Sequence, residues 1–179
     1  MDAGANEQVV ERKGSFVRIR YRLWTDQGEY VRGDPREGDA ILEFFTGYRQ
    51  VLPSLEERLV GRSSGERLRF EIGPEEAFGQ YREELIREKS FDEFPEGRSL
   101  EAGKWAVARD DKTRVAYGYY VREKRQDSII LDYNHPLAGR TLIYELLIEE
   151  VRPATQEEKI ILRPCEAGKV GEGQEEDAE

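Results

Sequence analysis

The chain turns at Asp132-Tyr133-Asn134-His135-Pro136-Leu137-Ala138-Gly139, a stretch that separates two runs of strand-forming residues. It holds His135, the only histidine of the 179 residues. Pro136 and Gly139 act on the backbone for steric reasons, so the stretch predicts a turn in any fold. The residues that follow, from Thr141 to Tyr144, indicate the beginning of a strand.

The composition is that of a polar, acidic chain. Its 38 acidic and 28 basic side chains give a net charge of −10, which argues against non-specific binding to nucleic acid. No segment approaches the ~18 consecutive apolar residues of a membrane-spanning helix, and residues 1–8 lack the basic and apolar regions of a signal peptide. We expect a cytoplasmic protein that acts as a monomer, with no nucleic acid and no membrane partner.

Cys165 is the only cysteine, so no intrachain disulfide can form and a reducing cytoplasm is the natural compartment. A structural zinc site needs four thiolate or imidazole ligands, and this chain offers only Cys165 and His135. We therefore expect neither a metal nor a cofactor. His135 is expected to be structural, with its ring held by hydrogen bonds within the turn.

The first part of the chain reads as antiparallel strands. Alternating apolar residues predict a strand over Phe16–Trp24, and a hairpin turn at Asp26–Gly28 leads to a second strand. A third apolar run lies at Ile41–Thr46. After a helix, a fourth strand is predicted whose apolar face holds Leu68, Phe70 and Ile72.

One short helix is predicted within residues 51–61. Leu55 and Leu59 have helical spacing and would share one face of it. Pro53 is tolerated in a first turn, and Gly61 is placed to end the helix. This part of the chain therefore predicts a helix laid across an antiparallel sheet.

Residues 80–133 read as a second, smaller sheet, although residues 81–94 are charged and hard to assign. Trp105 and Val107 alternate in one strand, a turn is expected at Asp110–Lys112, and Ser128–Leu131 forms the last strand. The strand between them alternates through Val115, Tyr117, Tyr119 and Val121.

The C-terminal part predicts one more strand and a short helix. The strand carries Leu142, Tyr144, Leu146 and Ile148 on one face. Thr155 and Glu158 have the spacing of a helix capping box. Residues 1–13 are expected to be frayed and residues 166–179, acidic and rich in glycine, to be disordered.

These motifs together resemble the SlyD-like branch of the FKBP-type prolyl isomerases. The likeness lies in the Asn-His-Pro-Leu-Ala-Gly turn at 134–139, in the Pro-x-x-Ala-aromatic-Gly turn at 74–79 and in the order of strands around the helix. Leu55-Glu56, followed by Leu59-x-Gly61 and then Gly65-Glu66, extends the match.

The resemblance implies a mostly β (α+β) fold, with an FKBP-like antiparallel half-barrel sheet wrapped on a short helix. Residues 14–79 and 134–153 would form this discontinuous isomerase domain. Residues 80–133 would form a small β-rich chaperone domain inserted in its flap. Residues 154–179 would form a C-terminal helix turn and an acidic, disordered tail.

The activity that the resemblance implies is cis-trans isomerisation of X-Pro bonds in unfolded or nascent polypeptides. The barrier of ~18 to 20 kcal/mol comes from the partial double bond, so an apolar pocket with one or two hydrogen-bond donors suffices. The Leu52 N–H would bind a substrate carbonyl next to proline. The pocket would be lined by Tyr21, Val31, Leu42, Val51, Leu52, Leu55, Phe78, Leu137 and Tyr144. For any one of these residues, an ordinary place in the core is the alternative.

Two positions depart from the family pattern. Arg32 stands where the family commonly has aspartate, and Phe78 stands where it commonly has tyrosine. Phe78 keeps the apolar wall but loses a phenolic donor, worth ~0.5 to 1.5 kcal/mol. We therefore expect weaker turnover, and the alternative function is a holdase or peptide-binding module without useful isomerase activity.

The inserted residues would add chaperone activity by presenting aromatic side chains to unfolded chains. Either face of the predicted sheet could be the binding face, since alternation alone does not tell them apart. The candidates are Phe91, Phe94, Trp105, Tyr117, Tyr119 and Tyr120. The nickel-binding His/Cys-rich tail of the branch has no counterpart here, so metal storage is not implied.

Overall fold

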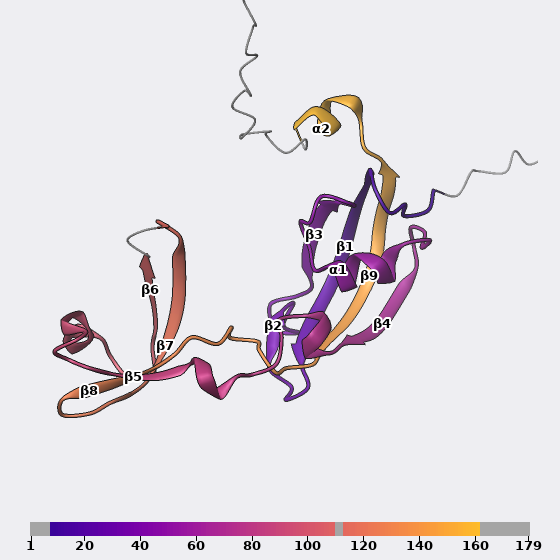
Figure 1. Cartoon of the computed structure of the whole chain (residues 1–179). Helices are drawn as coiled ribbons and strands as arrows, with labels where there is room; N and C mark the ends of the chain where they lie inside the picture. Colours follow the sequence, from indigo (N-terminus) through magenta and orange to yellow (C-terminus); the bar gives the residue numbers. More distant parts are fainter. Residues whose placement is uncertain (1–7, 110–112, 162–179) are drawn as a thin grey trace, which may run out of the picture.

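The computed structural model describes residues 8–109 and 113–161, which form two antiparallel sheets (Figure 1). The fold is mostly β with a short helix on the first sheet, as predicted. The elements in chain order are β1 (Ser15–Thr25), β2 (Tyr30–Arg32), β3 (Ala40–Phe45), α1 (Pro53–Leu59), β4 (Arg67–Ile72), η1 (Pro74–Glu76), η2 (Glu83–Leu85), β5 (Ile86–Ser90), η3 (Pro95–Ser99), β6 (Trp105–Arg109), β7 (Ala116–Lys124), β8 (Ser128–Asp132), β9 (Leu142–Pro153) and α2 (Gln156–Ile161).

The first sheet is built around the pair β1 and β9. β9 also pairs with β4, whereas β2 and β3 lie along the other edge of β1. The inward side chains of β1 alternate with arginines, which place one face in the core and the other in water. That core includes Ile19 from β1, Leu142 and Ile148 from β9, and the two leucines of α1.

α1 lies across the inner face of this sheet (Figure 1). Pro53 occupies its first turn, and Gly61 follows its C-terminal end with a φ of +80°, a conformation that glycine adopts without strain. Leu55 and Leu59 are fully buried, and each contributes ~1.5 to 3 kcal/mol by leaving water. The predicted helix is therefore confirmed.

The second sheet has the strand order β5-β8-β7-β6 and a core of its own. Phe91, Tyr119 and Val121 pack there with Ile129 and Leu131. β5, which the sequence left unassigned, pairs with β8 along its whole length.

The large apolar residues of β6 face outward. Trp105 is 48% exposed and Val107 is 75% exposed, while Ala106 and Ala108 pack against the core of the second sheet. The prediction of a strand is confirmed, and the structure identifies the small residues as its inner face. The expected turn at Asp110–Lys112 lies outside the described residues.

The N-terminal prediction was partly wrong. Val10 is 1% exposed and belongs to the core of the first sheet, so this part of residues 1–13 is packed and not frayed. Backbone hydrogen bonds of 2.8 Å join Val10 to Gly61 and Arg62, just beyond α1. The expectation of disorder for 166–179 concerns residues outside the described ranges.

The capping box at the start of α2 is confirmed. The Thr155 N–H donates to Oε2 of Glu158 over 2.7 Å, and the Glu158 N–H donates to Oγ1 of Thr155 over 3.2 Å. No helix of the described residues is long and apolar enough to cross a membrane.

Candidate active site

The nine residues predicted to line the pocket all belong to one apolar cluster on the inner side of the first sheet. Tyr21, Leu55 and Tyr144 are buried within it. The other six pack against it and are partly buried: Val31, Leu42, Val51, Leu52, Phe78 and Leu137. Strands β1, β2, β3 and β9, helix α1 and the two turns at 74–79 and 134–139 therefore converge here. Their role in substrate binding stays a prediction.

Two stacked tyrosines form the floor of this cluster. The rings of Tyr21 and Tyr144 lie 6.1 Å apart between centroids, and Tyr144 stacks on Phe70 of β4 at 5.6 Å. The pairing of β9 with both β1 and β4 sets this row of rings, since Tyr144 lies opposite both Leu23 and Phe70. The prediction from sequence missed Phe70 as part of the floor.

Both tyrosine hydroxyl groups are available as donors. Neither hydroxyl hydrogen-bonds to any group in residues 8–109 and 113–161. No polar side-chain atom of the described residues is both buried and unpaired, so these two hydroxyls reach accessible space. The floor of the cluster is thus apolar except for the two tyrosine hydroxyl groups.

Burial keeps these phenols protonated. It raises the pKa of Tyr144 to about 12, with a smaller contribution from Tyr21. Burial also raises the pKa of Tyr21, although the positive charge of Arg32 acts in the opposite direction. Both groups therefore remain hydrogen-bond donors throughout the neutral pH range.

Leu52 precedes α1 and offers a third donor. Its carbonyl accepts from the N–H groups of Leu55 and Glu56, at 3.0 and 3.1 Å. Its own N–H has no acceptor among the described residues. An unpaired backbone donor beside an apolar cluster is rare unless a ligand or water satisfies it.

Phe78 is held at the edge of the cluster by the turn that carries it. The Ser54 hydroxyl of α1 donates to the Glu76 carbonyl over 2.7 Å, and Arg58 forms an ion pair with the Glu76 carboxylate at 3.1 Å. The Gly79 N–H closes the turn on the Pro74 carbonyl. α1 therefore positions this aromatic wall, a role of Ser54 and Arg58 that sequence motifs did not indicate.

His135 contacts the same wall from the other turn. Its ring stacks on Phe78, with the centroids 3.9 Å apart and the planes within 5°. Its Nδ1 accepts a hydrogen bond of 3.1 Å from the Leu137 N–H. The expectation that the turn itself holds the ring is therefore confirmed, and the stacking is an addition.

Arg32 lies exposed at the rim. Its guanidinium donates to the Val31 carbonyl over 2.8 Å. Its charge opposes the burial that raises the pKa of Tyr21, so it acts on the floor of the cluster. A positive charge therefore borders the cluster where the family pattern has a negative one.

The segments that lead to and from the second sheet are joined beside the cluster. The Gly139 N–H donates to the Gly79 carbonyl over 2.8 Å. Gly139 has a φ of +71°, and a Cβ atom there would come within 3.0 Å of Tyr81, so a side chain would disturb this junction.

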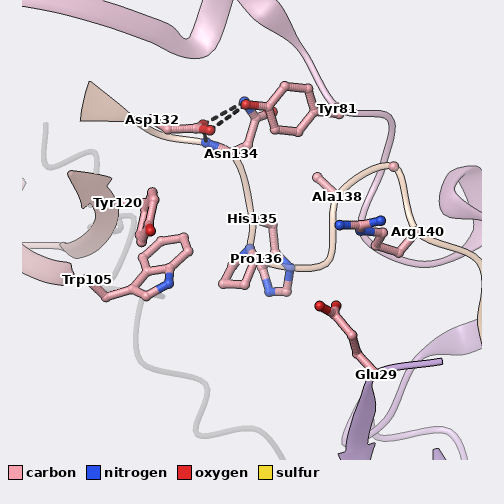
Figure 2. Close-up of a pocket in the computed structure, with 11 residues that line it drawn as sticks. Glu29, Tyr81, Trp105, Tyr120, Asp132, Asn134, His135, Pro136, Ala138 and Arg140 are labelled. Atoms are coloured by element: carbon pink, nitrogen blue, oxygen red, sulfur yellow. Dashed lines mark hydrogen bonds between the residues drawn. The ribbon is translucent and has the colours of Figure 1, made fainter. Parts of the chain in front are cut away.

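Asn134 ties the same two segments together, and Figure 2 shows its bond to Asp132. The side chain of Asn134 exchanges two hydrogen bonds of 2.9 Å with the Arg82 backbone. The Tyr81 hydroxyl donates to the Asp132 carboxylate. These polar contacts connect positions about 50 residues apart, and no local pattern in the sequence pointed to them.

A cavity of about 640 Å³ opens next to this junction (Figure 2). Trp105 and Tyr120 of the second sheet lie on one side of it, and Glu29 and Arg140 on the other. His135 and Pro136 lie between them. Within the described ranges, no three His, Cys, Asp or Glu side chains are grouped to hold a metal ion.

The predicted aromatic residues of the second sheet divide into two groups. Phe91 and Tyr119 are buried in its core, with Phe94 partly buried against them. Trp105 is exposed and Tyr120 is intermediate on the outer face of the sheet, whereas Tyr117 is exposed on the opposite face, where it pairs with Ala108. Trp105 and Tyr120 contact each other at 5.5 Å, so the exposed aromatic face continues into the cavity.

A half-barrel sheet wrapped on one helix, with a cluster of aromatic residues between them, is the fold that the resemblance to the FKBP-type isomerases implies. The family model for FKBP-type peptidyl-prolyl cis-trans isomerases matches residues 8–106. The relatives that carry the name FKBP-type peptidyl-prolyl cis-trans isomerase SlyD include those of three bacteria. That of Treponema pallidum is 34% identical, over 86% of this chain and 81% of its own length. Those of Vibrio cholerae and Escherichia coli are each 30% identical, over 82% of this chain and 71% and 72% of their lengths.

The chain belongs to the SlyD-like FKBP-type peptidyl-prolyl cis-trans isomerases. The resemblance read from the turns at 74–79 and 134–139 is thereby confirmed, as is the assignment to the isomerases. The family assigns the reaction, rotation about the bond before proline, and this reaction needs neither a nucleophile nor a cofactor.

Proposed function

We propose that this protein accelerates proline-limited folding of unfolded or nascent polypeptides and also acts as a chaperone for them. The observation that carries the first activity is the unpaired N–H of Leu52 at the edge of an apolar cluster. The nine clustered residues are the proposed substrate pocket, with Leu52 binding the carbonyl next to the proline.

The proposed pocket acts on the barrier in two ways. The stacked rings of Tyr21 and Tyr144 take the proline ring out of water, which favours the less polar, twisted amide. Donors that are already fixed in place need no reorganisation when the amide twists. They therefore stabilise the charge distribution of the twisted transition state more than that of the planar amide. Leu52 N–H and the two phenolic hydroxyls are the donors available for this.

The chaperone activity is assigned to the second sheet. We propose that residues 80–133 form an inserted domain and that residues 14–79 and 134–153 form the isomerase domain. Trp105 and Val107 are large apolar residues exposed on the outer face of β6, and Tyr120 of β7 lies opposite Trp105 on the same face. An unfolded chain could bury these side chains, and a folded monomer gains nothing by exposing them.

The isomerase proposal is tested by refolding a protein whose slow phase is limited by a trans-to-cis proline bond. Catalytic amounts of this protein should accelerate that phase without changing its final amplitude. If aggregation is suppressed while the slow phase keeps its rate, the protein is a holdase, and Arg32 and Phe78 are the first residues to examine.

The chaperone proposal is tested with the double variant Trp105→Ser, Val107→Ser. It should lose suppression of aggregation while its turnover of a short proline peptide stays unchanged. The matched control is Ile160→Ser, which removes an apolar side chain of intermediate exposure (66%, between Trp105 and Val107) from α2. Equal loss in both variants would contradict a client site on β6.

Compartment and assembly complete the proposal. We propose that the protein acts in the cytoplasm, because a chain with a single cysteine forms no intrachain disulfide and suits a reducing compartment. We also propose that it acts as a monomer. Sedimentation at two concentrations checks the second point, and fractionation of cells that express the whole protein checks the first.

A further inference from the structure

His135 contacts two residues of the proposed pocket at once. Its ring stacks on Phe78 at 3.9 Å, and its Nδ1 accepts from the Leu137 N–H at 3.1 Å. A backbone N–H can only donate, so Nδ1 carries no proton and the ring is neutral in this arrangement. A proton on Nδ1 would place two donors face to face.

The position of His135 is set from the junction and not from the pocket. Asn134 immediately before it is 4% exposed and bound to Arg82 and Asp132. The Ala138 N–H donates to the His135 carbonyl over 2.9 Å, and Pro136 fixes the backbone between them. The imidazole is therefore placed by the segment that returns from the second sheet.

The turn that carries Phe78 is tied to α1 before this residue and to the returning segment after it, where the Gly139 N–H donates to the Gly79 carbonyl. Ser54 and Arg58 fix Glu76, two residues before Phe78. The inner side of the Phe78 ring packs against the apolar cluster, and its outer side stacks on the ring of His135. Removing or tilting the imidazole would free the ring of Phe78 to leave the edge of the cluster.

We propose that His135 is a positioning residue for the isomerase pocket, whose neutral ring holds Phe78 and Leu137 in place so that its protonation lowers turnover. This inference rests on the proposed function of the cluster. It links the geometry of the pocket to the junction with the second sheet through one titratable side chain.

Tyr120 of β7 lines the same cavity as His135, and the other charged and titratable groups around His135 come from three further segments. Glu29 lies on the turn between β1 and β2, Tyr81 and Asp132 lie at the junction, and Arg140 lies on the returning segment. Asp132 is already bound to Tyr81 and Asn134. Burial lowers the pKa of His135 below its ordinary value of 6.5, so the neutral form predominates at pH 7 and is lost only as the pH falls through this lowered pKa.

Two substitutions separate the two contacts. His135→Asn keeps an acceptor at the position of Nδ1, as in an Asx turn, but loses the ring. His135→Phe keeps the stacked ring but loses the acceptor. Neither variant titrates. His135→Ala removes both contacts.

The experiment measures kcat/KM on a proline peptide between pH 5 and 8. Wild-type kcat/KM should fall in the acid range through one titration, whereas His135→Asn and His135→Phe should give flat profiles. At pH 7.5, His135→Ala should lower kcat/KM by about tenfold, with the other two variants between it and the wild type. An active wild type whose pH profile is shared by all three variants would overturn the inference and leave the isomerase proposal intact.

A second measurement tests the positioning role of His135 without relying on turnover. In an NMR titration of the wild type, the amide proton of Leu137 and the ring protons of Phe78 should shift with the same pKa as His135. A wild type that shows no turnover at any pH would refute the proposed function, and this titration would still report on the positioning. Signals of Leu137 and Phe78 that do not follow His135 would overturn it.

Discussion

Asn134 pairs with both backbone polar groups of Arg82. Its Oδ1 accepts from the Arg82 N–H and its Nδ2 donates to the Arg82 carbonyl, each over 2.9 Å. The side-chain amide thus bonds to Arg82 as the backbone of a neighbouring strand would. In this way it joins the segment that leads to the second sheet with the segment that returns from it. Because Asn134 is buried, water cannot substitute freely for these bonds.

Replacing Asn134 by alanine should lower the free energy of unfolding by about 1 to 3 kcal/mol, since polar groups in a buried place lose their partners. Urea unfolding followed by tryptophan fluorescence measures this, with Trp24 reporting on the first sheet and Trp105 on the second. The control is Gln126→Ala in an exposed loop, expected within about 0.5 kcal/mol of the wild type. A similar effect of both changes would mean that the pairing contributes nothing.

Leu52 allows the role of a single N–H to be measured. Its φ of −56° suits proline, and its N–H makes no bond within the described chain, so Leu52→Pro deletes the donor without breaking a protein hydrogen bond. Leu52→Ala is the matched control, because it shortens the side chain and keeps the N–H. We expect kcat/KM of the proline variant to lie about tenfold below that of the alanine variant. Equal values would exclude the N–H from substrate binding.

Phe78 and Arg32 should limit turnover. Phe78→Tyr restores a phenolic donor on a ring that stays stacked on His135, and we expect kcat/KM to rise by up to about tenfold. Arg32→Asp removes the positive charge near Tyr21 and should increase turnover of peptides with a basic residue near the proline. A peptide series of varied charge, measured at low and high salt, checks the second effect. Unchanged kinetics in both variants would show that the pocket lies elsewhere.

Glu158 should make the C-terminal helix sensitive to acid. Hydrogen bonds from Arg152 and from the Thr155 N–H, with the charge of Arg152, lower the pKa of Glu158 to about 2. A carboxyl group whose pKa is lowered on folding stabilises the fold above its unfolded value, near 4.5, and loses this as the pH falls toward 2. Glu158→Gln should therefore lower Tm at pH 7 and leave it nearly unchanged at pH 2. An equal decrease at both pH values would contradict an electrostatic role.

Local patterns predicted the parts of this fold that are set locally. Period-two alternation identified β1 and β9, and the spacing of Thr155 and Glu158 identified a cap that the structure forms. The turns at 74–79 and 134–139 led to the family, and the family led to the nine clustered residues. The strand and cap signals lie within a few residues of the features that they predict, whereas the nine clustered residues were reached only through the family pattern.

Features that depend on distant partners could not be read in this way. β5 carries three charged residues in succession, and its place in the sheet comes from pairing with β8 about 40 residues later. In β6, large and small residues alternate, and this pattern alone could not show which of the two sets faces the core. Ala106 and Ala108 fit against the core because bulky residues of other strands already fill it. Val10 packs in the core of the first sheet while its backbone pairs with the segment beyond α1, about 50 residues later in the chain.

The hydrogen bond between Gly79 and Gly139 also bears on how the first sheet forms. β4 and β9 are neighbours in that sheet, yet residues 80–138 separate the two glycines along the chain. A flexible loop of that length resists closure because of the conformational entropy that it loses. If the residues between them fold first, the two ends already lie together, and the strands can pair as though a short hairpin joined them. The contact order that governs the folding rate would then be far lower than the covalent sequence suggests.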